Sequence, residues 1–204
     1  MSQTAPELEC FFDCSSPWTY LGFHNIQPLA AEFGVEISWR PILVGGLFNT
    51  INPSVYAGRE NPVPAKQSYT HKDLQDWARH AGITIRWPMT IFPINSVKAM
   101  RGCIAAGRQG KLVPYATRVF EAYWGHDRDI TQEDVLAEIA AASGLDPDQM
   151  AAAMAADDIK TELRENTEEL AKRGGYGSPT FFVGGDDMYF GNDRMPLIKA
   201  ALTA

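Results

Sequence analysis

The sequence predicts an α/β protein in which two sheet-forming parts flank a long helical block. Apolar residues run or alternate at strand spacing near both ends of the chain, at 8–12, 35–39, 180–183 and 188–190. Between these parts, residues 66–174 carry apolar side chains almost entirely at helical spacing. The chain has 204 residues, of which 45% are hydrophobic and 21% charged, and is therefore long enough to bury a sizeable core.

The first sheet-forming part is predicted to be a strand, a helix and a second strand. Residues 8–12 form a short apolar run typical of a buried strand, and a helical pattern follows from 17 to 33. Pro17 suits a first helical position because its missing N–H has no partner there, and Gly34 is a typical stop. Residues 35–39 then alternate, so the two strands are expected to be parallel with a right-handed crossover.

Residues 41–64 are rich in Gly, Asn and Pro and lack periodicity, which predicts a long loop. Helices are then expected at 66–80, 95–108 and 113–124, after an N-cap at Thr131, from a start at 146–149, and from about 157 to 173.

The second sheet-forming part follows a Gly-rich break at 174–177. A tight Gly-Gly-Asp-Asp turn between two apolar segments predicts a hairpin. Asn192 or Asp193 is expected to cap a last helix that ends near Leu202. This order is the thioredoxin arrangement, which predicts a thioredoxin-like domain from 1–64 and 175–204 and an inserted all-helical domain at 65–174.

Composition argues against several classes of function. The net charge is −7 and no basic run occurs, so a nucleic-acid partner is not expected. No apolar stretch approaches ~18–20 residues, so no membrane-spanning segment is predicted. The N-terminal residues lack the pattern of a signal peptide and the cysteine count is odd, which favours the cytoplasm. No Cys/His spacing predicts a metal site.

Ser16 lies where the first strand turns into the first helix. Redox enzymes can carry a Cys-x-x-Cys pair at such a turn, and this chain has Ser16-Pro17-Trp18-Thr19 instead. A helix N-terminus stabilises anions, so a neutral hydroxyl there suits a thiolate supplied by a bound small molecule. The alternative is that Ser16 is simply an N-cap, the usual role of a Ser-Pro pair at a helix start.

Ser178 and Pro179 precede the hairpin, at the position where thioredoxin folds carry a cis proline facing the active turn. A cis bond would present the backbone of Ser178 to a peptide-like ligand. The alternative is an ordinary trans proline at the start of a strand.

Five segments together resemble the family of 2-hydroxychromene-2-carboxylate isomerases and kappa-class glutathione transferases, a branch of the DsbA-like thioredoxin superfamily. They are "FFDCSSPWTYLGF", "RPILVGG", "PAKQSYTHKDLQDWA", "YGSPTFFV" and "FGNDR". The first and the last, at this separation and flanking a helical block, form the specific part of the resemblance.

The resemblance implies a glutathione-dependent enzyme, and a homodimer is expected. It makes Ser16 the catalytic residue, with Pro17 and Trp18 beside it, and it pairs the backbone of Ser178, ahead of cis Pro179, with the cysteinyl part of glutathione. It also implies binding of the γ-glutamyl end by Gly191, Asn192 and Asp193, and an approach of Lys66 to the ligand from the helical part.

Two of these assignments have simpler alternatives. A carboxylate at Asp193 could pair with an α-ammonium group, or it could be a plain N-cap. Lys66 could equally be a solvated surface lysine.

The segment from Gly46 to Pro64 is longer than in the mammalian kappa-class pattern. Asn52 and Asn61 are therefore both candidates for a substrate-binding asparagine, and the loop is expected to line the pocket for the second substrate. Cys14 is expected to be a buried cysteine at the end of a strand rather than a redox thiol.

The leading hypothesis is a glutathione-dependent isomerase in the catabolism of aromatic hydrocarbons, acting on a small aromatic or unsaturated acid such as a 2-hydroxychromene-2-carboxylate. The alternatives are a kappa-like transferase or peroxidase that consumes glutathione, and a glutathione-binding protein without activity. The absence of a Cys-x-x-Cys pair argues against a disulfide oxidoreductase.

Overall fold

The computed structural model describes residues 6–203, and the strands among them form one mixed sheet. The strands are β1 (Leu8–Phe12), β2 (Ile37–Pro41), β3 (Thr180–Val183) and β4 (Asp187–Phe190), in the order β2-β1-β3-β4. β1 is parallel to β2, and β3 is antiparallel to both β1 and β4. The predicted α/β thioredoxin-like fold is confirmed, although the second strand begins at Ile37 rather than Val35.

Alternate residues of β1 point into two different apolar cores, one on each face of the sheet. Cys10 and Phe12 belong to a large main core, which they share with side chains of α1 (Pro17–Phe33) and α10 (Met195–Leu202). Phe11 points to a smaller second core on the other face, made by Phe11, Ile42, Leu47, Leu170 and Phe182. That second core is completed by α2 (Val44–Thr50) and α9 (Asp157–Lys172).

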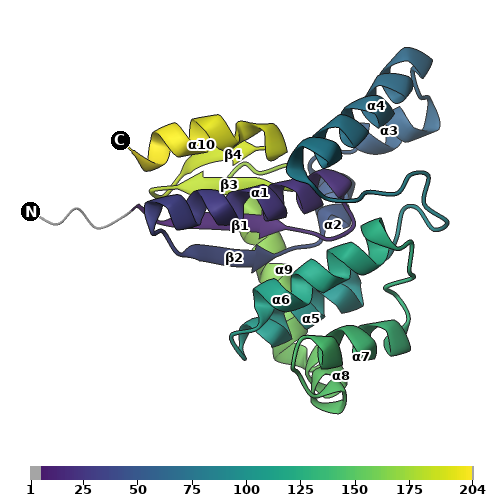
Figure 1. Cartoon of the computed structure of the whole chain (residues 1–204), viewed down its shortest axis with the longest axis vertical. Helices are drawn as coiled ribbons and strands as arrows, with labels where there is room; N and C mark the ends of the chain where they lie inside the picture. Colours follow the sequence, from purple (N-terminus) through teal and green to yellow (C-terminus); the bar gives the residue numbers. More distant parts are fainter. Residues whose placement is uncertain (1–5, 204) are drawn as a thin grey trace, which may run out of the picture.

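The helices between β2 and β3 extend the main core away from the sheet (Figure 1). They include α4 (Pro64–Ala81), α5 (Val97–Gly107), α6 (Leu112–Phe120), the π-helical turn η1 (Glu121–Gly125), α7 (Glu133–Ala142) and α8 (Pro147–Ala155). Tyr115, Tyr123 and Trp124 are among the largest fully buried side chains, so the junction of these helices is filled by aromatic rings.

The prediction of a loop over residues 41–64 is wrong, because this segment contains α2 and α3 (Ser54–Glu60). Each helix has only seven residues, too short for a periodic pattern to be recognised. α2 also has no side-chain cap. Its first turn depends on distant groups: Leu43 N donates to Thr167 Oγ1 at 3.0 Å, and Val44 N donates to Asp13 Oδ2 at 2.8 Å.

The first half of α4 stands away from the rest of the molecule together with α3 (Figure 1). Every residue from Glu60 to Lys72 is exposed, and burial begins only at Leu74 and Ala78, which join the main core. No helix within residues 6–203 combines the length and the apolar character that a membrane span requires.

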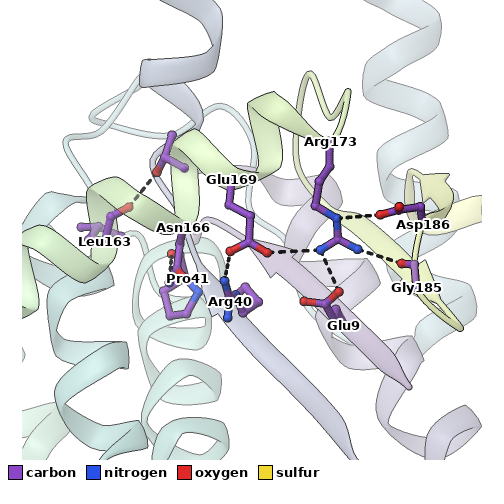
Figure 2. A network of polar contacts seen from close by, with 10 residues as sticks. Glu9, Arg40, Pro41, Leu163, Asn166, Glu169, Arg173, Gly185 and Asp186 are labelled. Carbon is purple, nitrogen blue, oxygen red and sulfur yellow. Dashed lines mark hydrogen bonds and ion pairs between the residues drawn. The ribbon is translucent and has the colours of Figure 1, made fainter. Parts of the chain in front are cut away.

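A polar network attaches α9 to the sheet on the face of the second core (Figure 2). The Arg173 guanidinium donates to Glu9 Oε1 in β1 at 2.7 Å and to the Gly185 carbonyl in the hairpin turn at 2.8 Å. It also contacts Glu169, which pairs with Arg40 of β2. One helix is thereby tied to both halves of the sheet.

Candidate functional site

Ser16 is the N-cap of α1. Its Oγ accepts a hydrogen bond from Thr19 N at 3.3 Å, and Pro17 occupies the first turn of the helix. The N-cap interpretation is therefore confirmed, and it leaves the hydroxyl hydrogen free. Within residues 6–203 no protein acceptor takes that hydrogen, and Ser16 is only half-buried. Ser16 can donate to a ligand while its oxygen caps the helix.

The Ser178–Pro179 peptide bond is cis, as predicted. The Ser178 hydroxyl joins this loop to the turn that carries Ser16: Asp13 N donates to Ser178 Oγ at 3.0 Å, and Thr19 Oγ1 lies 2.8 Å from the same oxygen. Among the described residues no hydrogen bond engages the backbone N–H or carbonyl of Ser178. Those two groups are available to an extended ligand.

Gly22 explains how the cis proline approaches α1 so closely. A Cβ atom at this position would lie 2.6 Å from Pro179 Cγ and 3.1 Å from Pro179 Cβ. A glycine inside a helix costs about 1 kcal/mol relative to alanine, so its presence indicates a close approach.

The Asp13 carboxylate connects several segments around the turn that carries Ser16. Its Oδ1 accepts from Ser15 N at 2.9 Å and its Oδ2 from Val44 N at 2.8 Å, while Ser96 at the start of α5 also bonds to the carboxylate. Burial raises the pKa of Asp13, and these hydrogen bonds oppose that rise. Asp13 fixes the turn that carries Ser16 to α2 and α5.

The segment Gly191–Asp193 lies against the cis proline loop, because Gly191 N donates to the Pro179 carbonyl at 3.1 Å. Asn192 is buried, and its Nδ2 has no hydrogen-bond partner among the described residues. Asp193 is exposed and pairs with Arg194 at 2.5 Å.

The prediction that Asn192 or Asp193 caps the last helix is wrong. A 3-10 turn, η2 (Asn192–Arg194), precedes α10, and neither helix has a side-chain cap. The Asn192 amide is therefore not used by the helix that follows it.

The other predicted site residues differ in whether they contact the cis proline loop. Asn52 Nδ2 donates to the Tyr176 carbonyl at 3.3 Å, which places Asn52 beside the loop that leads to cis Pro179. Asn61 is exposed between α3 and α4, and Lys66 is exposed in the first turn of α4, on the part of that helix that stands away from the molecule. Trp18 is half-buried and packs against the main core.

The cysteines are placed for packing rather than for redox chemistry. Cys10, Cys14 and Cys103 are all free and fully buried. Burial is the largest of the effects that raise the pKa of each thiol, and nearby Asp13 adds to it for Cys14 and Cys103. A protonated and inaccessible thiol is a poor nucleophile, so the prediction of a structural Cys14 agrees with its environment.

The candidate site is formed where the start of α1, the cis proline loop and the segment Gly191–Asp193 meet. A separate cavity of about 430 Å³ beside α1 is lined by His24, Glu121 and His126 among others, and its lining includes neither Ser16 nor Ser178. No group of three or more His, Cys, Asp or Glu side chains within residues 6–203 is arranged to hold a metal ion.

Comparison with known proteins shows the family of the chain. The model of the DsbA-like thioredoxin domain family matches residues 7–203. The chain belongs to that family. A 2-hydroxychromene-2-carboxylate isomerase of Pseudomonas putida is 27% identical over 195 residues, covering 96% of this chain and 93% of the relative. Glutathione S-transferase kappa 1 of Homo sapiens is 26% identical, covering 96% of this chain and 90% of the relative.

Solved structures show the same relationship. The structure of a 2-hydroxychromene-2-carboxylate isomerase superposes with a TM-score of 0.81 at 26% identity, covering 96% of this chain and 94% of that one. The isomerases and kappa-class transferases that the five sequence segments resemble are thus relatives along nearly the whole chain.

Sequence reasoning missed the residues that support the site from below. Asp13 and Thr19 lie inside the segment "FFDCSSPWTYLGF", yet only the fold shows that they meet Ser178. Trp124 is a further residue of this kind, because its Nε1 donates to the Cys14 carbonyl at 2.8 Å. Gly22 gave a usable signal, since an interior helix glycine is unusual.

Proposed function

We propose that this protein is a glutathione-dependent isomerase that acts on a small unsaturated aromatic acid of the 2-hydroxychromene-2-carboxylate type. The observation that carries the proposal is the junction at the start of α1. There a hydroxyl with an unused hydrogen, an unpaired peptide at Ser178 and an unpartnered amide at Asn192 belong to segments held together by hydrogen bonds. The relatives include proteins named for this isomerase activity.

The residues present fit glutathione in its chemistry. Ser16 would donate to the thiolate sulfur at the positive end of the helix dipole. The free N–H and carbonyl of Ser178 would pair with the cysteinyl backbone of the tripeptide. Asn192 Nδ2 is a donor without a partner and would bond to a γ-glutamyl carboxylate oxygen, beside Gly191 and Asp193.

Bound glutathione would supply a thiolate that adds reversibly to a conjugated double bond, so that rotation precedes elimination and the tripeptide is regenerated. The contribution of the protein is to keep that sulfur ionised and oriented. Ser16 holds it from the helix start, with Pro17 and Trp18 in the same turn, while the Asp13 network keeps the turn in place. The buried cysteines offer no competing thiolate.

The second candidate function is a kappa-like transferase, which would form a permanent bond between glutathione and an electrophile. The relatives include both classes, and the same Ser16 geometry serves either reaction. Asn52, beside the cis proline loop, is the better placed of the two candidate asparagines for contact with the second substrate.

The deciding experiment incubates the protein with glutathione and 2-hydroxychromene-2-carboxylate and measures both substrate absorbance and free thiol. An isomerase converts the substrate while the thiol concentration stays constant, whereas a transferase consumes one thiol per turnover. No glutathione-dependent change in the substrate would contradict the isomerase assignment.

Five further expectations accompany this proposal and remain predictions. They are a cytoplasmic location, a homodimer, a role in the catabolism of aromatic hydrocarbons, an approach of Lys66 to the ligand, and the division into a domain at 1–64 and 175–204 and a helical insertion at 65–174.

A further inference from the structure

The connection between α4 and α5 holds apolar side chains out towards solvent. Met89 and Ile94 of this connection are buried, whereas Ile91, 40% exposed, and Phe92, 39% exposed, lie between them in the sequence. Large apolar side chains are usually buried, so two adjacent exposed ones form a small apolar surface on this connection.

Hydrogen bonds from the neighbouring segment hold this connection in its shape. Tyr123 OH donates to the Ile91 carbonyl at 2.7 Å. Asp127 accepts from Thr90 twice, from the backbone N at 3.0 Å and from Oγ1 at 2.6 Å. Arg86 N also donates to the Trp124 carbonyl at 2.8 Å. The exposed side chains are therefore fixed on a braced loop.

Trp124 links this loop directly to the active turn. Its Nε1 donates to the Cys14 carbonyl at 2.8 Å, two residues before Ser16. Its ring lies 6.3 Å from the Phe92 ring and 6.4 Å from the Trp87 ring, between centroids, with Trp87 nearly parallel to it. Phe92 also packs edge-on against Trp87 at 4.9 Å. One indole thus separates the exposed Phe92 from the backbone of the turn that carries Ser16.

We infer that Ile91 and Phe92, backed by Trp87, form the wall against which the planar ring of the second substrate packs. This inference rests on the proposed function and adds to it the part of the chain that selects an aromatic substrate. In Figure 1 the connection between α4 and α5 runs past the end of the sheet at which α1 and α2 begin, on the side of the candidate site. An aromatic ring is the ligand class that a braced Phe face beside two indoles favours, through offset or edge-to-face contacts.

The aromatic contact then lies outside residues 46–64, the segment that the sequence predicted to line the pocket. That segment would then contribute Asn52 as a polar contact, while the α4–α5 connection supplies the apolar surface.

The test is equilibrium binding of naphthalene-2-carboxylate, a planar aromatic acid, to the full chain with glutathione present. Quenching of tryptophan fluorescence reports it, since Trp87 and Trp124 lie behind the proposed wall. We expect Phe92→Ala to weaken naphthoate binding about two- to tenfold. Phe92→Leu should bind with intermediate strength, and glutathione affinity should stay unchanged in both variants.

Leu197→Ala is the matched control, because Leu197 is an exposed apolar residue, 54% exposed, on α10. Equal naphthoate binding by the wild type and Phe92→Ala, or an equal loss in Leu197→Ala, would overturn the inference. It would also be overturned if Phe92→Ala changed the oligomeric state, since Phe92 would then contact a second copy of the chain. Phe92-dependent naphthoate binding without any turnover of 2-hydroxychromene-2-carboxylate would support the aromatic wall and reject the proposed isomerase.

Discussion

At the scale of single residues, two buried polar side chains differ in their hydrogen bonding, and this difference assigns one to ligand binding and the other to stability. Asn192 has a donor without a partner, which is a cost to the folded protein unless a ligand uses it. Asp13 has the opposite arrangement, because several donors from distant segments satisfy its carboxylate. The first is expected to act in binding and the second in holding the turn.

Replacement of Asn192 by leucine is expected to weaken glutathione binding without destabilising the fold. The variant keeps the volume of the side chain and removes an unsatisfied amide, so the free energy of unfolding should stay equal or rise by up to about 1 kcal/mol. The lost hydrogen bond to a carboxylate corresponds to about 1.5–3 kcal/mol of binding. Calorimetric titration with glutathione and urea unfolding measure the two quantities. Lower stability with unchanged affinity would show a structural role.

Asp13→Asn is expected to give a distinctive dependence of stability on pH. The folded-state pKa of Asp13 is raised, so the folded chain holds this proton more tightly than the unfolded chain, whose value is about 3.9. Wild-type stability relative to the variant should therefore fall as pH rises from about 3.9 through the raised value, and then level off. The measurement is the free energy of unfolding of both proteins between about pH 3.5 and about pH 7. If the difference in unfolding free energy between the wild type and Asp13→Asn did not vary with pH, a raised pKa of Asp13 would be contradicted.

At the scale of elements, the contact between α1 and the cis proline loop determines the geometry of the site. Gly22→Ala adds a methyl group 2.6 Å from Pro179 Cγ. We expect a net destabilisation of about 1–3 kcal/mol, despite the better helix propensity of alanine, and weaker glutathione binding because the loop must shift.

Gly58→Ala is the matched control for this substitution. Gly58 lies inside α3, and its added Cβ would have no neighbour within 4 Å. This variant should be stabilised by about 0.5–1 kcal/mol through helix propensity alone. Thermal unfolding measures both variants. If Gly22→Ala and Gly58→Ala changed the stability equally, close packing of Gly22 on Pro179 would be excluded.

The elements also show what the sequence can and cannot predict. β1, α1 and the cis bond at Pro179 follow from an apolar run, a helical period with Pro and Gly at its ends, and a position in a known order of elements. α2 does not, because its first turn depends on Asp13 and Thr167, residues distant in sequence. The Trp124–Cys14 bond was missed for the same reason: it joins positions 110 residues apart.

At the scale of the whole molecule, Arg173 ties the end of the helical block to the sheet (Figure 2). Its side chain is 17% exposed and that of its partner Glu9 is 12% exposed, and its guanidinium lies 3.6 Å from the centroid of the Phe182 ring. α9 leads from this point directly into the loop with Ser178 and Pro179, so the network positions one side of the site.

Arg173→Met is expected to destabilise the protein by about 3 kcal/mol, since Glu9 would keep a nearly buried charge without its partner. Arg164→Met is the control, because the Arg164–Glu168 pair is exposed on both sides and its loss should cost no more than about 0.5 kcal/mol. Chemical unfolding of both variants gives the comparison. Equal losses would mean that the network adds nothing beyond an ordinary surface pair.

The most direct test of the central claim is the pKa of the glutathione thiol in its complex with the protein, measured by ultraviolet titration of thiolate absorbance. If Ser16 donates to the sulfur at the start of α1, the pKa in the wild-type complex should lie well below that of an ordinary thiol, about 8.5, and should return towards that value in Ser16→Ala. Turnover should fall about 10²- to 10³-fold in the same variant, while glutathione affinity changes far less. The same thiol pKa in both complexes would contradict the role of Ser16.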